Sequence, residues 1–355
     1  MNIKLLTYYE INPRAWQKLV DESPTATWFQ TLEAYQFYAS QKNEMIPLAI
    51  GVEEDGTLVG VVVGYITQEK NALKQYLTRR AIIVGGPLLA ENISDEALTA
   101  LLLAVTNTSR LSPSGGPGKV RDFVGGSFAS RLQNPIYIET RNFNDYSRWK
   151  SVFEANGFAY QPHLNFHLNC QSDNILSPMS ESRRRQIRKA IKNGARIEEA
   201  QSEIDVRSFY SILSELYVSK VKMPLFSLDF FLSFYRNGFG KFLLVKDNDI
   251  VIGGIMCPIL HNNTIYEWFV CGQDEKYKDL YPSVMATYAA IEYAHKNCIS
   301  KFDFMGAGKP DEAYGVRDFK ARFGGEQVEY GRFLCIRKPL LYTIGKLGVK
   351  ILKKR

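Results

Sequence analysis

The sequence has few cysteines and histidines, and this scarcity excludes several kinds of protein. The five cysteines are odd in number and form no Cys-x-x-Cys pair. This pattern does not indicate a disulfide framework or a zinc site, and it fits a reducing compartment. Of the four histidines, His163 and His167 lie four residues apart. On a strand they would share a face, and we interpret them as packing or surface residues. We expect no metal and no cofactor.

Signals for export and for membrane insertion are also missing. No apolar run reaches the roughly 18 residues that span a bilayer, and the start, MNIKLLTYYEINPRAW, lacks the apolar core of a signal peptide. We therefore expect a cytoplasmic protein. Lys and Arg number 44 against 37 Asp and Glu, giving a net charge of +7. This excess is compatible with an anionic ligand but does not identify one.

The chain contains two similar halves. Leu48–Ile66 and Leu243–Leu260 each have the pattern of strand, turn and strand, and each is followed by a helix, a short strand, and a helix that ends at glycine before another strand. Gly60 and its counterpart Gly253 are farther apart in the sequence than Trp149 and its counterpart Phe319. The first half therefore contains extra sequence between these two positions. We assign it to the Gly/Ser/Pro-rich segment 109–135, a flexible insertion or, alternatively, a lid.

This order of elements resembles the GNAT-type N-acyltransferase fold. We predict an α/β (α+β) protein of two tandem GNAT-like domains, each a mixed, mostly antiparallel sheet flanked by helices. The predicted domains are residues 1–168 and 169–338, joined by a crossover at Gln161–Cys170, and a basic amphipathic helix follows at 339–355.

A strongly basic helix is predicted at the start of the second half, with Ser177 as its N-cap, Pro178 in its first turn and Gly194 at its end. Arg185 and Arg188 lie on its polar face, whereas Arg183 lies among its apolar residues. The polar face is either a solvated surface or a phosphate-binding stripe. The position of Arg183 predicts a buried or interfacial contact.

Several motifs together resemble the Fem-type aminoacyltransferases, which are tandem GNAT-like enzymes. The motifs are RRRQIRKAIKNGARI, LYPSVMATYAAIEYA, FDFMG and DFKARFGG, in that order, with FQTLEAYQFY near the start. The resemblance covers most of the chain and is strongest over Ser177–Phe333. It implies transfer of an amino acid from aminoacyl-tRNA to an amine of a peptidoglycan-precursor peptide, in the synthesis of the cell wall.

The resemblance also implies site residues. The Phe-Lys pair that lines the transfer site in the family matches Phe319-Lys320, and a phosphate-binding arginine falls within 183–188. An ammonium group can stabilise the oxyanion that forms when an amine attacks an ester, which supports a catalytic Lys320. The alternative is an exposed helix lysine, because Trp149-Lys150 repeats the pattern in the first half.

Four further residues are candidates. Asp303, at a strand end, binds the acceptor amine in one interpretation and caps the following turn in the other. Glu267 is a general base or, as we favour, an ion-pair partner. Tyr314 and Arg317 flank the Phe-Lys helix and are predicted to line the pocket.

Two departures from the sequence patterns of known acyltransferases keep other functions open. The stretch Ala34–Tyr38 lacks the lysine that the family carries there, which disfavours a nucleotide-linked acceptor. An acyl-CoA-dependent GNAT acyltransferase is the first alternative, although Gln273 is followed by Glu275, Lys276 and Tyr277 instead of the pyrophosphate-binding glycines. The second alternative is a non-catalytic tandem-GNAT protein that binds anionic ligands.

The tail, Lys338–Arg355, has an apolar sector of Leu340, Leu341, Ile344, Leu347 and Ile351 opposite its lysines. A helix of this kind can lie on an anionic membrane surface, here the inner face. It can equally dock its apolar sector on the protein with the lysines in water.

Overall fold

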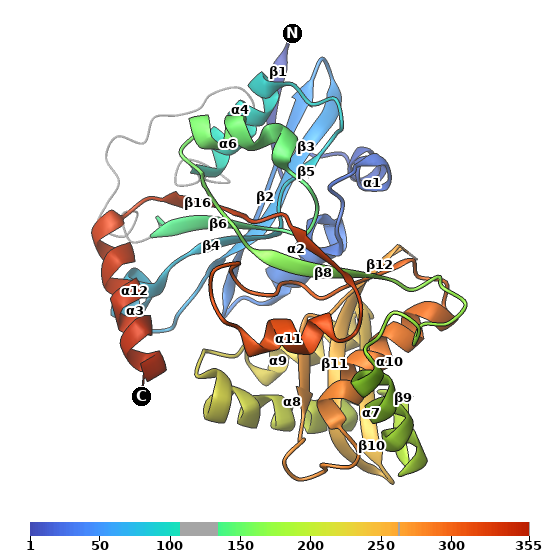
Figure 1. Cartoon of the computed structure of the whole chain (residues 1–355). Helices are drawn as coiled ribbons and strands as arrows, with labels where there is room; N and C mark the ends of the chain where they lie inside the picture. Colours follow the sequence, from blue (N-terminus) through green and yellow to red (C-terminus); the bar gives the residue numbers. More distant parts are fainter. Residues whose placement is uncertain (107–133, 262, 355) are drawn as a thin grey trace. The chain divides into compact units, whose positions relative to one another are not determined.

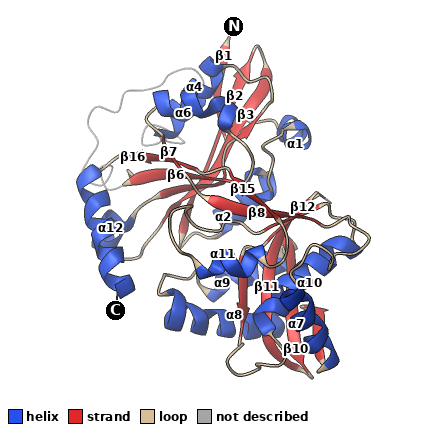
Figure 2. Cartoon of the chain, in the orientation of Figure 1, coloured by secondary structure: helices blue, strands red, loops and turns tan. Residues whose placement is uncertain are grey.

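The computed structural model describes residues 1–106, 134–261 and 263–354. These form two compact units, one of Met1–Gln161 with Tyr330–Arg355 and one of Pro162–Glu329 (Figure 1). Each unit contains a mixed, mostly antiparallel sheet flanked by helices (Figure 2), which confirms the predicted fold class. Most of the predicted insertion at 109–135 lies outside the described residues.

The first unit has the strand order β1-β2-β3-β4-β6-β16-β7, and β5 pairs with β3. Among the strands that the structure describes here, only the β4–β6 pair is parallel. Its strands are β1 (Ile3–Thr7), β2 (Met45–Glu54), β3 (Thr57–Thr67), β4 (Ala81–Gly85), β5 (Leu88–Leu89), β6 (Tyr137–Asn142), β7 (Ala159–Gln161) and β16 (Arg332–Ile336). Its α-helices are α1 (Pro13–Glu22), α2 (Leu32–Ser40), α3 (Ala72–Thr78), α4 (Asp95–Thr106), α6 (Lys150–Ala155) and α12 (Pro339–Lys354).

The second unit has the order β15-β8-β14-β12-β11-β10-β9, and β13 pairs with β11. Of its described strand pairs, only β12–β14 is parallel. Its strands are β8 (Leu164–Asn169), β9 (Ala195–Glu199), β10 (Gly240–Asp247), β11 (Ile250–Leu260), β12 (Thr264–Tyr266), β13 (Phe269–Gly272), β14 (Lys301–Asp303) and β15 (Glu326–Glu329). Its α-helices are α7 (Glu181–Lys192), α8 (Glu203–Leu216), α9 (Leu228–Arg236), α10 (Pro282–Lys296) and α11 (Gly315–Ala321).

The predicted hairpins are present in both units. β2 and β3 are joined at Asp55 and Gly56, and β10 and β11 turn at Asn248, with φ values of 46°, 83° and 52°. Asp, Gly and Asn tolerate this left-handed conformation, which explains why these residues mark the turns. Each sheet packs against helices through its own core of Val, Ile, Leu and Phe.

Two strands, β8 and β16, belong to a different sheet from the one that their place in the sequence suggests. β8, from the predicted crossover, lies between β14 and β15 of the second sheet. β16 lies in the first sheet, between β6 and β7, although the sequence prediction assigned residues 332–336 to the second domain. Phe333 stacks on Phe153 at 4.1 Å in the first core. Because the halves are alike, both sheets need such a strand, and the repeat pattern does not say which strand fills which position.

The basic helix α7 begins later than the sequence predicts. Ser180 is its N-cap and accepts a hydrogen bond from the backbone N–H of Arg183. Ser177 belongs to a preceding turn, in which its hydroxyl donates to the carbonyl of Asn174. No helix in the described part of the chain is long and apolar enough to cross a membrane.

Candidate functional site

The turn that follows β14 is the centre of a buried polar network in the second unit. Met305 and Gly306 have positive φ values of 56° and 126°, so the chain leaves the strand sharply. Nζ of Lys320, on α11, donates to the carbonyls of Phe304 (2.6 Å) and Gly306 (2.9 Å). Lys320 therefore holds this turn from the neighbouring helix.

Glu267 is the charged partner of Lys320. Oε1 of Glu267 lies 2.9 Å from Nζ of Lys320, and the residues are only 4% and 8% exposed. Oε2 of Glu267 accepts a hydrogen bond from the hydroxyl of Thr287. Glu267 thus has the ion-pair position that the sequence analysis favours, and Lys320 is not the exposed helix lysine of the alternative. Of the three donors of the ammonium, two bond backbone carbonyls, and Glu267 supplies the opposite charge.

Asp303 lies on the other side of the same turn and is fully buried. Its Oδ1 accepts hydrogen bonds from the backbone N–H of Met305 (2.6 Å) and the side chain of Asn165 (2.8 Å). Its Oδ2 lies 3.1 Å from Nε2 of His167. Asp303 therefore caps the turn, as one of its two sequence interpretations expects.

The pKa of Asp303 reflects this environment. Burial acts to raise it, but the hydrogen bond and charge of His167, the amide of Asn165 and the charge of Lys301 together hold the pKa below its ordinary value. Asp303 is therefore ionised at neutral pH. An ionised carboxylate accepts and does not donate, so Asp303 can only accept a hydrogen from Nε2 of His167.

His167 and Asn165 were not among the predicted site residues. They alternate on β8 and so lie on one face of it, and His167 is the register partner of Asp303. The available signal was the polar alternation in LNFHLN, within an otherwise apolar strand. Asn165 also accepts from the N–H of Gly306, so the His167–Asp303 pair and Lys320 hold the same short turn.

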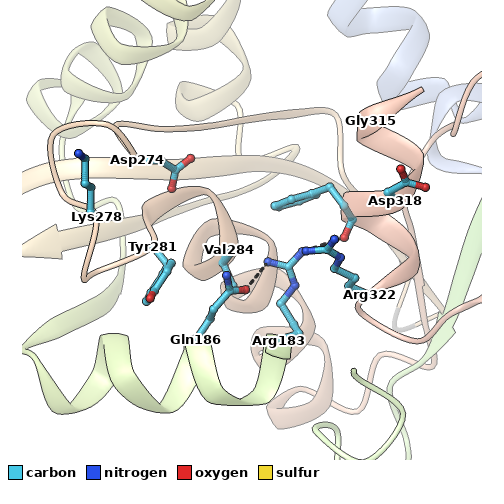
Figure 3. A pocket seen from close by; sticks show the side chains of 10 residues that line it. Arg183, Gln186, Asp274, Lys278, Tyr281, Val284, Gly315, Asp318 and Arg322 are labelled. Carbon is cyan, nitrogen blue, oxygen red and sulfur yellow. Dashed lines mark hydrogen bonds between the residues drawn. The ribbon is translucent and has the colours of Figure 1, made fainter. Parts of the chain in front are cut away.

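A pocket of about 500 Å³ lies on another side of α11. Figure 3 shows residues from α7, α10, α11 and the loop before α10 around it. The lining residues are Arg183, Gln186, Asp274, Lys278, Tyr281, Val284, Gly315, Asp318, Phe319 and Arg322. Two consecutive residues of α11 thus point to different sites: Phe319 lines the pocket, and Lys320 holds the turn.

Arg183 is the most buried charge of this pocket. Its guanidinium donates to the carbonyl of Phe319 (2.9 Å) and to Gln186 (3.0 Å), and it lies 4.4 Å and 4.3 Å from the ring centres of Phe319 and Phe323. Within the described residues, no carboxylate forms an ion pair with it, and its Nε is buried without a partner. The predicted buried contact of Arg183 is present.

Two effects destabilise the charge of Arg183. Burial, and then repulsion from Arg322, lower its pKa to about 10, and attraction from Asp274 offsets them only in part. An anion between Arg183 and Arg322 would relieve both effects. The arrangement is suited to binding a phosphate or carboxylate.

The other predicted residues are placed differently. Arg185 and Arg188 are exposed on α7 and do not line the pocket. Arg317 donates to the carbonyls of Ala307 and Pro310, so it shapes the loop before α11. Tyr314 is exposed beside Gly308. Neither Tyr314 nor Arg317 lines the pocket, where the sequence analysis expected them.

The N-terminus of α10 is occupied by a side chain of the protein. Asp274 accepts hydrogen bonds from the backbone N–H and the hydroxyl of Ser283, in the first turn of α10. A free helix N-terminus attracts anions, and this is the position at which the acyl-CoA alternative would place a CoA pyrophosphate. Among the described residues, no group of His, Cys, Asp and Glu could hold a metal ion.

Comparison with known proteins shows a family resemblance over part of the chain. The model of the FemAB family matches residues 236–350, a segment that contains Glu267, Asp303, Phe319 and Lys320. The solved structure of FemX has the same fold, with a TM-score of 0.67 at 15% identity, covering 97% of this chain and 99% of that one. The second half of the chain thus resembles the FemAB family, and the whole chain has the fold of FemX.

Two further structures share the tandem GNAT-like fold of this chain. L-PGS from Bacillus licheniformis has a TM-score of 0.56 at 12% identity, covering 97% of this chain and 98% of that one. A tandem GNAT protein from the clavulanic acid biosynthesis pathway has a TM-score of 0.54 at 9% identity, covering 94% and 98%. No curated protein matches the sequence. The predicted enzyme class, an acyltransferase, is confirmed by the family match.

Proposed function

We propose that the protein is an aminoacyltransferase that moves an amino acid from aminoacyl-tRNA to an amine of a peptidoglycan-precursor peptide. The observation that carries the proposal is Arg183, a buried guanidinium without a carboxylate partner in the described chain, at a pocket that Phe319 also lines. A guanidinium in this position is suited to a phosphate of the precursor. Arg183 is thus our choice among residues 183–188, ahead of the exposed Arg185 and Arg188.

The reaction makes one bond and breaks one. The acceptor amine attacks the ester carbonyl, a C–N bond forms, the C–O bond to the tRNA ribose breaks, and the proton lost by the amine ends on the ribose hydroxyl. The tetrahedral oxyanion needs a positive partner. Lys320 supplies it in our proposal, by exchanging one of its backbone carbonyl acceptors for the oxyanion, while Phe319 shapes the pocket.

His167 is our candidate for carrying the proton. Asp303 is fully buried, so it acts through His167, whose side chain is 13% exposed. With a hydrogen on Nε2, the neutral ring has Nδ1 as its acceptor nitrogen. Asp303 orients the ring, in the manner of a carboxylate that fixes a catalytic imidazole.

Asp274 disfavours the acyl-CoA alternative. Its carboxylate occupies the helix N-terminus that would receive a pyrophosphate, and its charge opposes a second anion there. The non-catalytic alternative differs in one respect, since it predicts ligand binding without turnover.

A transfer assay tests the proposal. The protein is incubated with a labelled aminoacyl-tRNA pool and either a nucleotide-linked or a lipid-linked muropeptide, and label in the peptide is counted. We expect transfer to at least one acceptor. Acetyl transfer from acetyl-CoA, with no transfer from tRNA, would establish the first alternative, and no turnover with any donor would favour the non-catalytic one.

A further inference from the structure

Helix α12 of the first unit exposes a stripe of apolar side chains. Leu340, Ile344 and Leu347 are 82%, 62% and 57% exposed, and their spacing places them on one face of the helix. The helix is attached through its other side, where the ring of Tyr342 packs against Tyr137 with 5.4 Å between ring centres. The apolar stripe is therefore not docked on the protein, in contrast to one of its two sequence interpretations.

The sequence of this segment is strongly basic. Seven of the nineteen residues from 337 to 355 are Lys or Arg, and none is Asp or Glu. Lys338 lies over the ring of Tyr76, 4.8 Å from its centre, and burial and then repulsion from Arg79 lower its pKa. This positive charge is thus incompletely balanced within the protein.

Helix α3 lies beside α12 (Figure 1). It exposes two more leucines, Leu73 and Leu77. Apolar side chains are therefore exposed on both helices of this part of the first unit. An exposed apolar area of this kind marks an interaction surface.

We propose that α12 binds an anionic lipid surface, with Leu340, Ile344 and Leu347 inserted at the level of the head groups. Apolar burial and attraction between basic residues and anionic lipids act together on such a helix. A neutral protein partner would leave the positive charge unmatched. The inference concerns where the protein acts, and it does not depend on the proposed donor or acceptor.

Vesicle co-sedimentation of the full-length protein tests this surface. The two preparations are vesicles of phosphatidylcholine alone and vesicles of equimolar phosphatidylcholine and phosphatidylglycerol. The test variant is Leu340→Ser/Ile344→Ser/Leu347→Ser, whose side chains are too exposed for the changes to disturb the core. The control is Ile204→Ser, an apolar residue that is 74% exposed on α8.

We expect the wild type and Ile204→Ser to bind the anionic vesicles and to be released by salt. The triple variant should bind at least about tenfold more weakly. Absence of wild-type binding, or equal binding by the triple variant, would overturn the proposal. A wild-type dimer that the triple variant loses, without vesicle binding, would assign the stripe to a second copy of the chain.

Discussion

Lys320 and Glu267 form a buried ion pair, with 2.9 Å between Nζ and Oε1. The pair links α11 to the segment between β12 and β13, and the remaining donors of Lys320 hold the turn after β14. A charge at this position is therefore part of the fold as well as a candidate for catalysis. Any test of Lys320 has to separate the two roles.

We expect Lys320→Ala to lower the free energy of unfolding by about 3–5 kcal/mol, because it leaves Glu267 buried and uncompensated. The double variant Lys320→Met/Glu267→Gln removes both charges and should regain much of this loss. If Lys320 stabilises the oxyanion, the double variant stays inactive although it is folded. Urea denaturation and the transfer assay, on the same preparations, check both parts; a folded double variant with normal turnover would exclude the catalytic role.

Arg183 provides a second prediction. Arg183→Lys keeps the charge but loses the planar fork that binds two oxygens of a phosphate at once. We expect the KM for the acceptor to rise about 10- to 100-fold and kcat to change little. Arg188→Lys, on the exposed side of the same helix, is the matched control and should leave KM unchanged. An equal effect of both substitutions would indicate a diffuse electrostatic contribution instead of a specific contact.

The proposed role of His167 predicts a change in the pH profile. His167→Gln should lower kcat by about 10²- to 10⁴-fold, the usual contribution of a general acid or base, and should remove the limb of the kcat profile that depends on imidazole. Asp303→Asn removes the negative charge beside the ring and also alters the cap on the turn after β14, and it should shift that limb. The charged neighbours to consider are Asp303 and Glu326, the register partners of His167 on its two sides. A profile unchanged in both variants would leave the pair a purely structural role.

Much of the fold follows from the sequence, and the reasons are local. Asp55-Gly56 and Asn248 mark the hairpins because the left-handed backbone conformation of these turns favours such residues. The similarity of the two halves allows the elements of one half to be predicted from those of the other. The assignment of β16 to the first sheet does not follow, because it depends on which of two similar sheets buries Phe333. Long-range pairing of this kind has no local signature.

The site is predictable to a smaller extent. Phe319 and Arg183 line the pocket as expected, but the sequence did not indicate that Lys320 is paired with Glu267, since 53 residues separate them along the chain. His167 was overlooked for a similar reason. Its significance comes from Asp303 on the neighbouring strand, and a histidine four residues from another suggests only a shared face.

Glu139 predicts how stability depends on pH. Burial would raise its pKa, but the guanidinium groups of Arg141 and Arg332, both 2.9 Å away, lower it to about 2 from 4.5. Because the folded value is depressed, the stabilisation is fully present above pH 4.5 and is lost as the pH falls towards 2. Across this window the free energy of unfolding should fall by about 1.4 kcal/mol per pH unit from this group alone. In urea titrations between pH 3 and 4, Glu139→Gln should reduce the slope by about this amount, and an unchanged slope would contradict the ion-pair account.

Phe333 tests whether β16 stabilises the first unit. It is buried, stacks on Phe153 and contacts Tyr160 edge-on, so Phe333→Ala should cost about 3–5 kcal/mol through the cavity that it leaves. Ile336→Ala, on the exposed end of the same strand, should cost less than about 1 kcal/mol and serves as the control. Hydrogen exchange separates the units: in Phe333→Ala the amides of β6 and β7 should lose protection before those of β10 and β11. Early loss of protection in β10 and β11 would instead place the stabilising role of this strand in the second sheet.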